Sequence, residues 1–178
     1  MLRSLTTMMC AIALAATGCS SIKSKLQPKP VEAVMTATAG NSAAGTLVVT
    51  AVPDGVHFHG RLTGLPPGST HGFHIHENGD CSAPDASTAG GHFNPTRSEH
   101  GDPVGMTHHA GDIANQVADA QGAIDVDATV HGVSLDTGVS DDVLGRALIL
   151  HRDADDYASQ PAGNSGPRIA CGVILKKP

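Results

Sequence analysis

The stretch T-L-V-V-T-A-V-P-D-G-V-H-F-H-G-R-L-T-G-L (46–65) decides the fold class. It contains two runs typical of strands, joined by the step Asp54-Gly55. An Asp-Gly step between two such runs is a strong signal for a β-hairpin. In the second run His57 and His59 alternate with Phe58, as in a strand that buries one face only. The stretch therefore predicts two antiparallel strands.

Further strand signals lie on both sides of this hairpin. They occupy residues 31–39, 72–76, 110–118, 123–130, 145–151 and 168–175. The sequence indicates no helix longer than a turn or two and no internal repeat. Several short strands separated by turn residues predict an all-β sandwich or barrel.

Two long segments interrupt the strand pattern. Residues 77–108 are rich in Gly, Pro, Ser, Asp and His, and residues 152–167 are rich in Gly and Asp. Loops of such length without their own secondary structure are uncommon and usually functional. We therefore expect two functional loops on one β scaffold.

Composition limits the class of protein. The chain has 178 residues, enough for one domain with a real core, and only 16% of them are charged. A net charge of −6 argues against nucleic acid as a partner, because such partners favour a basic face. The eleven histidines point instead to metal binding, since histidine is the commonest metal ligand.

The N-terminal residues have the features of an export signal. Arg3 precedes an apolar run at 8–16 that is too short to span a bilayer, and A-A-T-G-C ends at Cys19. This pattern resembles the bacterial lipoprotein signal, in which cleavage before the cysteine leaves it lipid-modified. We expect residues 1–18 to be a signal peptide, with ordinary cleavage nearby as the alternative to lipidation of Cys19.

The next segment, residues 19–30, is expected to be a flexible tether that carries the lipidated cysteine. It contains three lysines and two prolines without a clear hydrophobic period. The domain proper would then comprise residues 31–178, in the periplasm. Ser20 follows the cysteine where an aspartate would favour retention in the inner membrane, so we expect anchoring to the outer membrane.

Two cysteines remain for the domain, Cys81 and Cys171. An even pair in an exported protein favours a disulfide. The alternative, two thiolate metal ligands, is weaker because neither cysteine has a C-x-x-C partner.

Two His-x-His pairs are candidate ligands. In G-F-H-I-H (72–76) the apolar residues share one strand face, and His74 and His76 share the other. This pair leads directly into the long loop, which is rich in histidine. The pair at His57 and His59 is not followed by such a histidine-rich loop, and we interpret it as part of a solvated strand face.

The loop and the following strands supply further ligands. They are His92, His100, His108, His109, Asp112 and, at the end of a strand, His151. Three histidines with one carboxylate make a plausible tetrahedral zinc set. A set of nitrogen ligands alone suits Cu(II). The chain therefore offers ligands for two metals.

These motifs resemble those of a known family. G-F-H-I-H-E, G-G-H-F-N-P, E-H-G-D-P, H-x-G-D, G-R-A-L-I-L-H and G-P-R-I-A-C-G-V-I closely resemble the copper–zinc superoxide dismutases, and D-D-Y-A-S-Q-P resembles their exported bacterial branch. The likeness extends from about residue 31 to residue 175. It implies an eight-stranded Greek-key β-barrel with two long functional loops.

The resemblance also implies roles for single residues. Copper, one ion per subunit, would be bound by His74, His76, His92 and His151. Zinc, also one ion per subunit, would be bound by His92, His100, His109 and Asp112. His92 would thus bridge the two metals.

Further roles follow from the same resemblance. Cys81 and Cys171 match the family disulfide, and Arg168 matches the arginine that attracts the anion to copper. Asp155 matches a carboxylate that links one copper ligand to one zinc ligand, although Asp153 and Asp156 are neighbouring candidates. His71 and His131 remain structural or surface residues.

The implied activity is dismutation of superoxide to oxygen and hydrogen peroxide in antioxidant defence, with Arg168 and His92 as catalytic residues. A homodimer is a further expectation, because dimers are common in the family. The alternatives are an exported copper and zinc buffer and a lipoprotein in which zinc is purely structural. The complete ligand set together with Arg168 favours the enzyme.

Overall fold

The hairpin is formed by β2 (Ala44–Val52) and β3 (Gly55–Thr63) in the computed structural model, which describes residues 29–178. The two strands are antiparallel, with Ala44 opposite Thr63 and Val52 opposite Gly55. Phe58 is buried between the outward-facing His57 and His59. The predicted hairpin and the predicted alternation are therefore confirmed.

Six further strands complete the fold. They are β1 (Val31–Ala37), β4 (Thr70–His76), β5 (Asp112–Val117), β6 (Ile124–His131), β7 (Ala147–His151) and β8 (Arg168–Lys176). Each overlaps a run that the alternation of β-forming residues predicted. Within residues 29–178 the helical structure is a single 3-10 turn at Ser87–Ala89.

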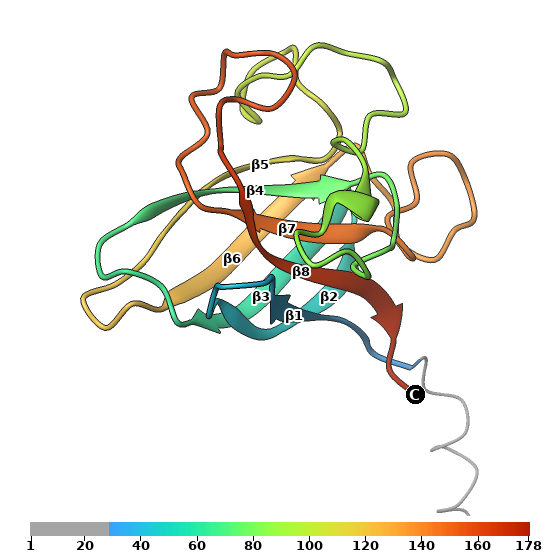
Figure 1. The fold of residues 1–178 in the computed structure, drawn as a ribbon. Helices are drawn as coiled ribbons and strands as arrows, with labels where there is room; N and C mark the ends of the chain where they lie inside the picture. Colours follow the sequence, from blue (N-terminus) through green and yellow to red (C-terminus); the bar gives the residue numbers. More distant parts are fainter. Residues whose placement is uncertain (1–28) are drawn as a thin grey trace, which may run out of the picture.

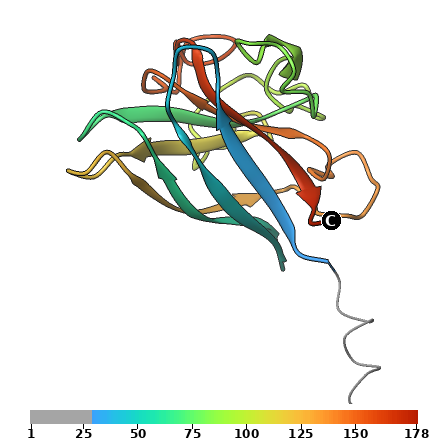
Figure 2. The same cartoon turned by 60° about the horizontal axis from the view of Figure 1, so that its bottom comes forward.

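The strands form a nearly closed barrel with Greek-key connections (Figure 1). Their order is β5-β4-β7-β8-β1-β2-β3-β6, and every neighbouring pair is antiparallel. The strands at the two ends of this order, β5 and β6, contact each other. Figure 2 shows the end of β8 beside the start of β1, where the Lys177 amide donates to the Pro30 carbonyl at 2.8 Å. The predicted fold class is confirmed.

The barrel encloses an aliphatic core with few aromatic rings. Its largest fully buried side chains include Phe58, Phe73, Leu47, Leu148 and Ile174. At about 25 cal/mol for each Å² of apolar surface removed from water, this core supplies the main force that holds the strands together. It also gives the loops a rigid platform.

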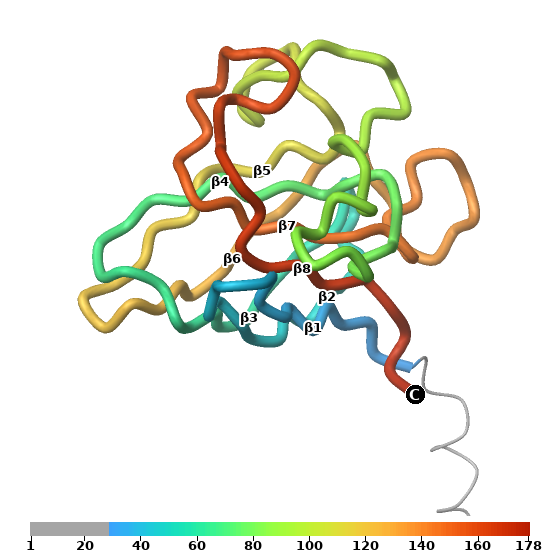
Figure 3. The backbone as a smooth tube through the Cα atoms, viewed as in Figure 1, coloured from blue at the N-terminus to red at the C-terminus, as the bar shows by residue number. Residues whose placement is uncertain are grey.

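Both long loops lie over the same side of this platform (Figure 3). The first runs from β4 to β5, and its Phe93 pairs with Ile75 through the backbone. A disulfide joins Cys81 in this loop to Cys171 in β8, which confirms the predicted pairing. The second loop, residues 152–167, runs from β7 to β8.

The predictions for the N-terminus lie outside the described residues. They concern the signal peptide, the lipidated Cys19 and most of the tether. In the part of the chain that the structure describes, no helix is long and apolar enough to cross a membrane.

Candidate metal centre

His74 and His76 reach the site through the alternation of β4. Phe73 and Ile75 point into the core, and the two histidines point to the opposite side. Both imidazoles are nevertheless buried, because the first long loop closes over them. The predicted placement of this pair is correct.

The first group of ligand candidates, here called the nitrogen cluster, consists of His74, His76, His92 and His151. One ring nitrogen of each lies within 4.8 Å of one from every other member, and all four residues are buried. β4 supplies two members, the first loop one, and the end of β7 one. The family resemblance implied this set, and the structure brings all four residues together.

Two rings in the nitrogen cluster have a fixed orientation. His76 donates from Nδ1 to the Gly90 carbonyl at 2.9 Å, and His151 donates from Nδ1 to the Gly166 carbonyl at 3.1 Å. The Nε2 atoms of these rings face each other at 3.4 Å. With both protons on Nδ1, neither Nε2 can donate to the other. Two opposed lone pairs fit a cation placed among them.

Two other nitrogens in the nitrogen cluster have no hydrogen-bond partner. They are Nδ1 of His74 and Nε2 of His92, and both are buried. A buried polar atom without a partner is costly and calls for an explanation such as a bound ion. The donor set therefore fits a metal that accepts imidazole nitrogen.

The second group, here called the mixed cluster, consists of His92, His100, His109 and Asp112. One ligand atom of each again lies within 4.8 Å of all the others. Asp112 Oδ1 lies 2.7 Å from His92 Nδ1, and Asp112 Oδ2 lies 3.0 Å from His100 Nδ1. His100 Nδ1 makes no hydrogen bond in spite of this short distance to Asp112. Three imidazoles and one carboxylate fit a tetrahedral zinc site.

His92 belongs to both clusters. Its Nδ1 faces Asp112 and lies 3.3 Å from His109 Nδ1, whereas its Nε2 faces the nitrogen cluster. A single ring can therefore contribute one nitrogen to each of two ions.

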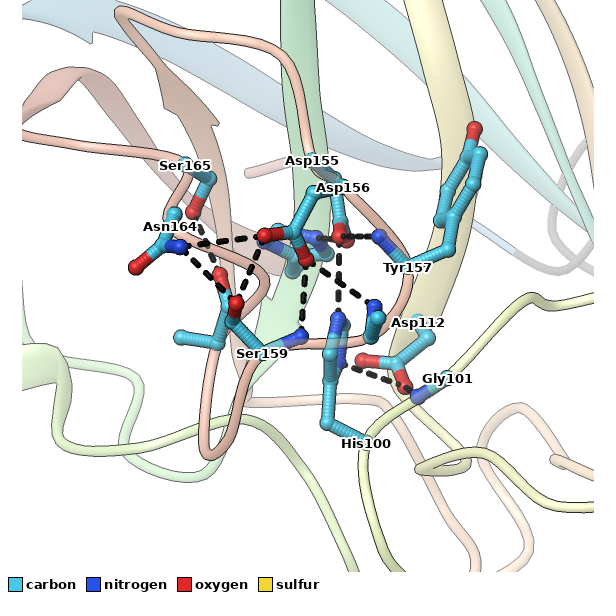
Figure 4. A network of polar contacts seen from close by, with 12 residues as sticks. His100, Gly101, Asp112, Asp155, Asp156, Tyr157, Ser159, Asn164 and Ser165 are labelled. Carbon is cyan, nitrogen blue, oxygen red and sulfur yellow. Dashed lines mark hydrogen bonds and ion pairs between the residues drawn. The ribbon is translucent and has the colours of Figure 1, made fainter.

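Asp155 connects the two clusters, and Figure 4 shows its contact with His100. His74 donates from Nε2 to Oδ2 at 2.7 Å, and His100 donates from Nε2 to Oδ1 at 2.9 Å. Such a carboxylate fixes the tautomer and orientation of each ring, so that Nδ1 is left for the metal.

The two neighbouring carboxylates have other partners. Asp153 pairs with Arg152 at 2.9 Å, and Asp156 accepts from Ser159 and Asn164. Among the three candidates, Asp155 is the residue that contacts both clusters.

Burial sets the charge of these groups. It lowers the pKa of His92 to about 4 and the pKa of His151 to about 3, so both rings are neutral near pH 7. Burial alone would raise the pKa of Asp112, but hydrogen bonds with His109 and His92 outweigh it and hold that pKa well below its usual range. Neutral imidazole and ionised carboxylate are the forms that bind metals.

A cavity of about 580 Å³ opens onto the nitrogen cluster. His76, His92 and His151 line it together with Arg168, the first residue of β8. The Arg168 guanidinium donates to the carbonyls of Ala86 and Gly90 in the first loop, so it is held at the cavity wall. This geometry places a cation beside the cluster.

Comparison with known proteins adds a family to this geometry. The family model described as copper/zinc superoxide dismutase matches residues 43–174. The chain belongs to this family. The cavity, the two clusters and the disulfide thus lie within the matched segment, because all of their residues fall between 74 and 171.

Two relatives and one solved structure are similar to this chain over most of its length. "Superoxide dismutase [Cu-Zn] 2" of Mesembryanthemum crystallinum is 40% identical over 151 residues, which are 81% of this chain and 94% of that protein. "Superoxide dismutase-like protein YojM" of Bacillus subtilis (strain 168) is 45% identical over 125 residues, which are 68% of this chain and 64% of YojM. The crystal structure of a SOD-like protein from Bacillus subtilis matches with a TM-score of 0.74 and 40% identity, over 81% of this chain and 97% of that one.

Several residues that support this dismutase-family site were not among the predicted site residues, although Tyr157 and Gln160 lie within the D-D-Y-A-S-Q-P motif. Gln160 accepts from the His100 amide and donates to the His100 carbonyl, both at 2.9 Å. Asn115 makes two hydrogen bonds with the backbone of Asp155, each 2.8 Å long. The backbone amide of Asn115 donates to the Tyr157 hydroxyl at 2.7 Å. These contacts join the second loop to the first loop and to β5.

Two histidines near the site are not members of either cluster. His71 is buried and donates from Nδ1 to the His151 carbonyl at 2.8 Å, so it supports a cluster residue as a structural group. His108 bonds from Nδ1 to the carbonyl of its neighbour His109. The family motif H-x-G-D contains His109, and the structure places His109 in the mixed cluster.

Proposed function

We propose that this protein is a copper- and zinc-dependent superoxide dismutase that converts superoxide to oxygen and hydrogen peroxide in antioxidant defence. The observation that carries the proposal is the pair of buried clusters that share His92 and adjoin a cavity with an arginine. A metal-storage protein has no need for an arginine at the mouth of its metal site.

The two clusters would hold different ions. The nitrogen cluster would hold copper, which supplies the one-electron chemistry needed to oxidise one superoxide and reduce the next. The mixed cluster would hold zinc, because three histidines and one aspartate match its preferred ligands. Each subunit would bind one ion of each metal.

Arg168 would bind the substrate. Superoxide is a small anion, and the chain as a whole has a net charge of −6 that repels it. A guanidinium fixed beside the cluster creates a local attraction that the overall charge does not provide. The carbonyls of Ala86 and Gly90 hold the charge where the anion arrives.

His92 would hold a proton and donate it to the product. Its Nδ1 is occupied on the side of Asp112, whereas its Nε2 lacks a hydrogen-bond partner and the ring lines the cavity. Nε2 is therefore the atom of this ring that can hold a proton and give it to a departing peroxide anion. Asp155 would keep the rings of His74 and His100 aligned throughout.

The proposed location is the periplasm, with a lipid anchor at Cys19 in the outer membrane. The support is the sequence pattern of residues 1–20. Replacing Cys19 with Ser should release the protein into the soluble periplasmic fraction if the anchor exists. Recovery of that variant with the membranes would contradict the anchor without affecting the proposed activity.

A homodimer is proposed on family resemblance alone. Sedimentation equilibrium of the soluble chain over a range of protein concentrations distinguishes a monomer from a dimer.

The activity is tested by pulse radiolysis. A soluble chain that begins at Ser20 is loaded with copper and zinc, and its rate of superoxide decay is compared with that of the form loaded with zinc alone. We expect fast decay that depends on copper and slows as salt is added. Stoichiometric uptake of both metals without catalytic decay would assign the protein to the alternative class of copper and zinc buffers.

A further inference from the structure

The outer face of β3 carries a second pair of histidines, which belong to neither cluster of the metal centre. His57 and His59 lie on the same face, because they flank the buried Phe58 on one strand. Their rings are nearly parallel, with centroids 6.2 Å apart and an angle of 20° between the ring planes. An isolated pair of this kind is usually a solvated surface feature.

The structure adds a carboxylate to this pair. β6 runs antiparallel to β3, with Asp127 directly opposite His59 and Thr129 opposite His57. The Asp127 side chain reaches diagonally to His57, where Oδ1 lies 2.6 Å from Nε2. Side chains of directly opposed residues in an antiparallel pair are also close neighbours. His57, His59 and Asp127, here called the outer-face cluster, therefore occupy one patch.

The neighbouring cation on this strand has other partners. Arg61 lies two residues after His59 and bonds to both oxygens of Asp125, at 2.5 and 2.6 Å, and to Asp119 at 3.0 Å. Asp127 is thus left to the histidines. Its side chain is 85% exposed and that of His57 is 29% exposed, so dissolved ions can reach both.

We propose that the outer-face cluster is an additional metal site, which binds a divalent ion of the copper and zinc class at the surface. Two imidazoles and a carboxylate are donors that suit these ions. Cu²⁺ should bind more tightly than Zn²⁺, as expected for nitrogen and oxygen ligands in the Irving–Williams order.

Binding requires one movement. The exposed His59 ring turns toward Asp127, and exposed side chains change rotamer within picoseconds to nanoseconds. Water completes the coordination, so the ion exchanges readily. This behaviour differs from that of an ion enclosed in the nitrogen or mixed cluster.

The test uses protein whose two buried clusters are already filled, so that it measures extra ions only. The loaded protein is dialysed to equilibrium against Cu²⁺, and separately against Zn²⁺, and the bound metal is counted. We expect one additional Cu²⁺ per chain, with nitrogen hyperfine splitting in its electron paramagnetic resonance spectrum. The additional ion should be lost in His59→Ala and bound more weakly in Asp127→Asn.

The matched control is Asp125→Asn, because Asp125 lies on the same exposed face of β6 as Asp127 but is bound by Arg61 and not by a histidine. This variant should retain the additional ion. The proposal is wrong if no additional ion binds, or if Asp125→Asn weakens its binding to the same extent as Asp127→Asn. The content of the buried metals should be equal in all variants, so the result is independent of the proposed dismutase activity.

Discussion

Three histidines of the nitrogen cluster each present a defined nitrogen to the metal centre, because the other nitrogen of each ring is occupied. His76 and His151 bond through Nδ1 to backbone carbonyls, and His74 bonds through Nε2 to Asp155. These contacts set the tautomers before any ion arrives. Preorganisation of this kind lowers the entropy that must be lost when a metal binds.

Asp155→Asn should weaken both metal sites. The asparagine keeps the shape but offers one acceptor oxygen where His74 and His100 both donate. Loss of such an outer contact typically lowers metal affinity about 10- to 100-fold. Competition with a chromophoric chelator measures both affinities, and Asp153→Asn is the control because Asp153 pairs with Arg152. Unchanged affinities in Asp155→Asn would show that the link is unimportant.

His92→Ala should reduce both copper and zinc occupancy, since His92 belongs to both clusters. His76→Ala should reduce copper alone, because His76 belongs only to the nitrogen cluster. Metal analysis after dialysis against a weak chelator compares the two variants. Full zinc occupancy in His92→Ala would exclude the bridging role.

Arg168→Ala should slow superoxide decay while both metals stay bound. Arg168 lines the cavity but is not a member of either cluster. Electrostatic steering changes association rates by about tenfold or more. Arg168→Lys keeps the charge but loses the two-pronged contact with the loop carbonyls, so it should retain more of the rate than Arg168→Ala. An unchanged rate for Arg168→Ala at low ionic strength would refute the role in anion binding.

At the scale of elements, the strands supply some of the ligand candidates and the two long loops supply the remaining ligands and their supporting contacts. The second loop passes very close to Asp155 at Gly163, where φ is 61°. A Cβ atom at this position would lie 1.8 Å from Asp155 Oδ1. Glycine is required there because any side chain at this position would overlap the Asp155 carboxylate.

Removal of the disulfide should loosen the first loop. A Cys81→Ala/Cys171→Ala variant no longer ties this loop to β8, although the barrel core stays intact. We expect a loss of about 2–5 kcal/mol in the free energy of unfolding, as is usual for native disulfides. Denaturant unfolding of the variant and of the wild type measures it. Equal stability would mean that the loop is held by its other contacts.

The sequence predicted the elements better than the contacts between them. Alternation in G-F-H-I-H placed His74 and His76 correctly, because a strand period acts over a few residues. Gln160 and Asn115 could not be found in this way. Their partners are far along the chain, at His100 and Asp155, and no local pattern records such a contact.

The same limit applies to the outer face of the barrel. His57 and His59 alone indicated a solvated strand face, because Asp127 is 70 positions from His57. Only the pairing of β3 with β6 brings the carboxylate to them. The choice of Asp155 among three neighbouring aspartates likewise came from family resemblance, and the structure supplies its physical basis.

For the molecule as a whole, metal binding and loop order should be coupled. Ions that bind the folded chain and not the unfolded chain stabilise it by mass action. Removal of both metals should lower the melting temperature and speed amide hydrogen exchange in the two long loops. The strands of the barrel should stay protected, because their core contains no metal ligand. Uniform acceleration over loops and strands alike would contradict this division.

The barrel core and the metal centre thus depend on different residues of one fold. The core needs only aliphatic packing, whereas the centre needs residues from β4, β5, β7, β8 and both loops. Family membership is consistent with both the core and the metal centre, since the matched segment spans residues 43–174.

X-ray diffraction from crystals of the loaded protein, recorded on both sides of the copper and zinc absorption edges, tests the two-metal centre most directly. We predict a copper peak among His74, His76, His92 and His151, and a separate zinc peak among His92, His100, His109 and Asp112. The His92 ring should lie between the two peaks. A single peak, or one cluster that holds both metals while the other stays empty, would contradict the shared histidine and the function built on it.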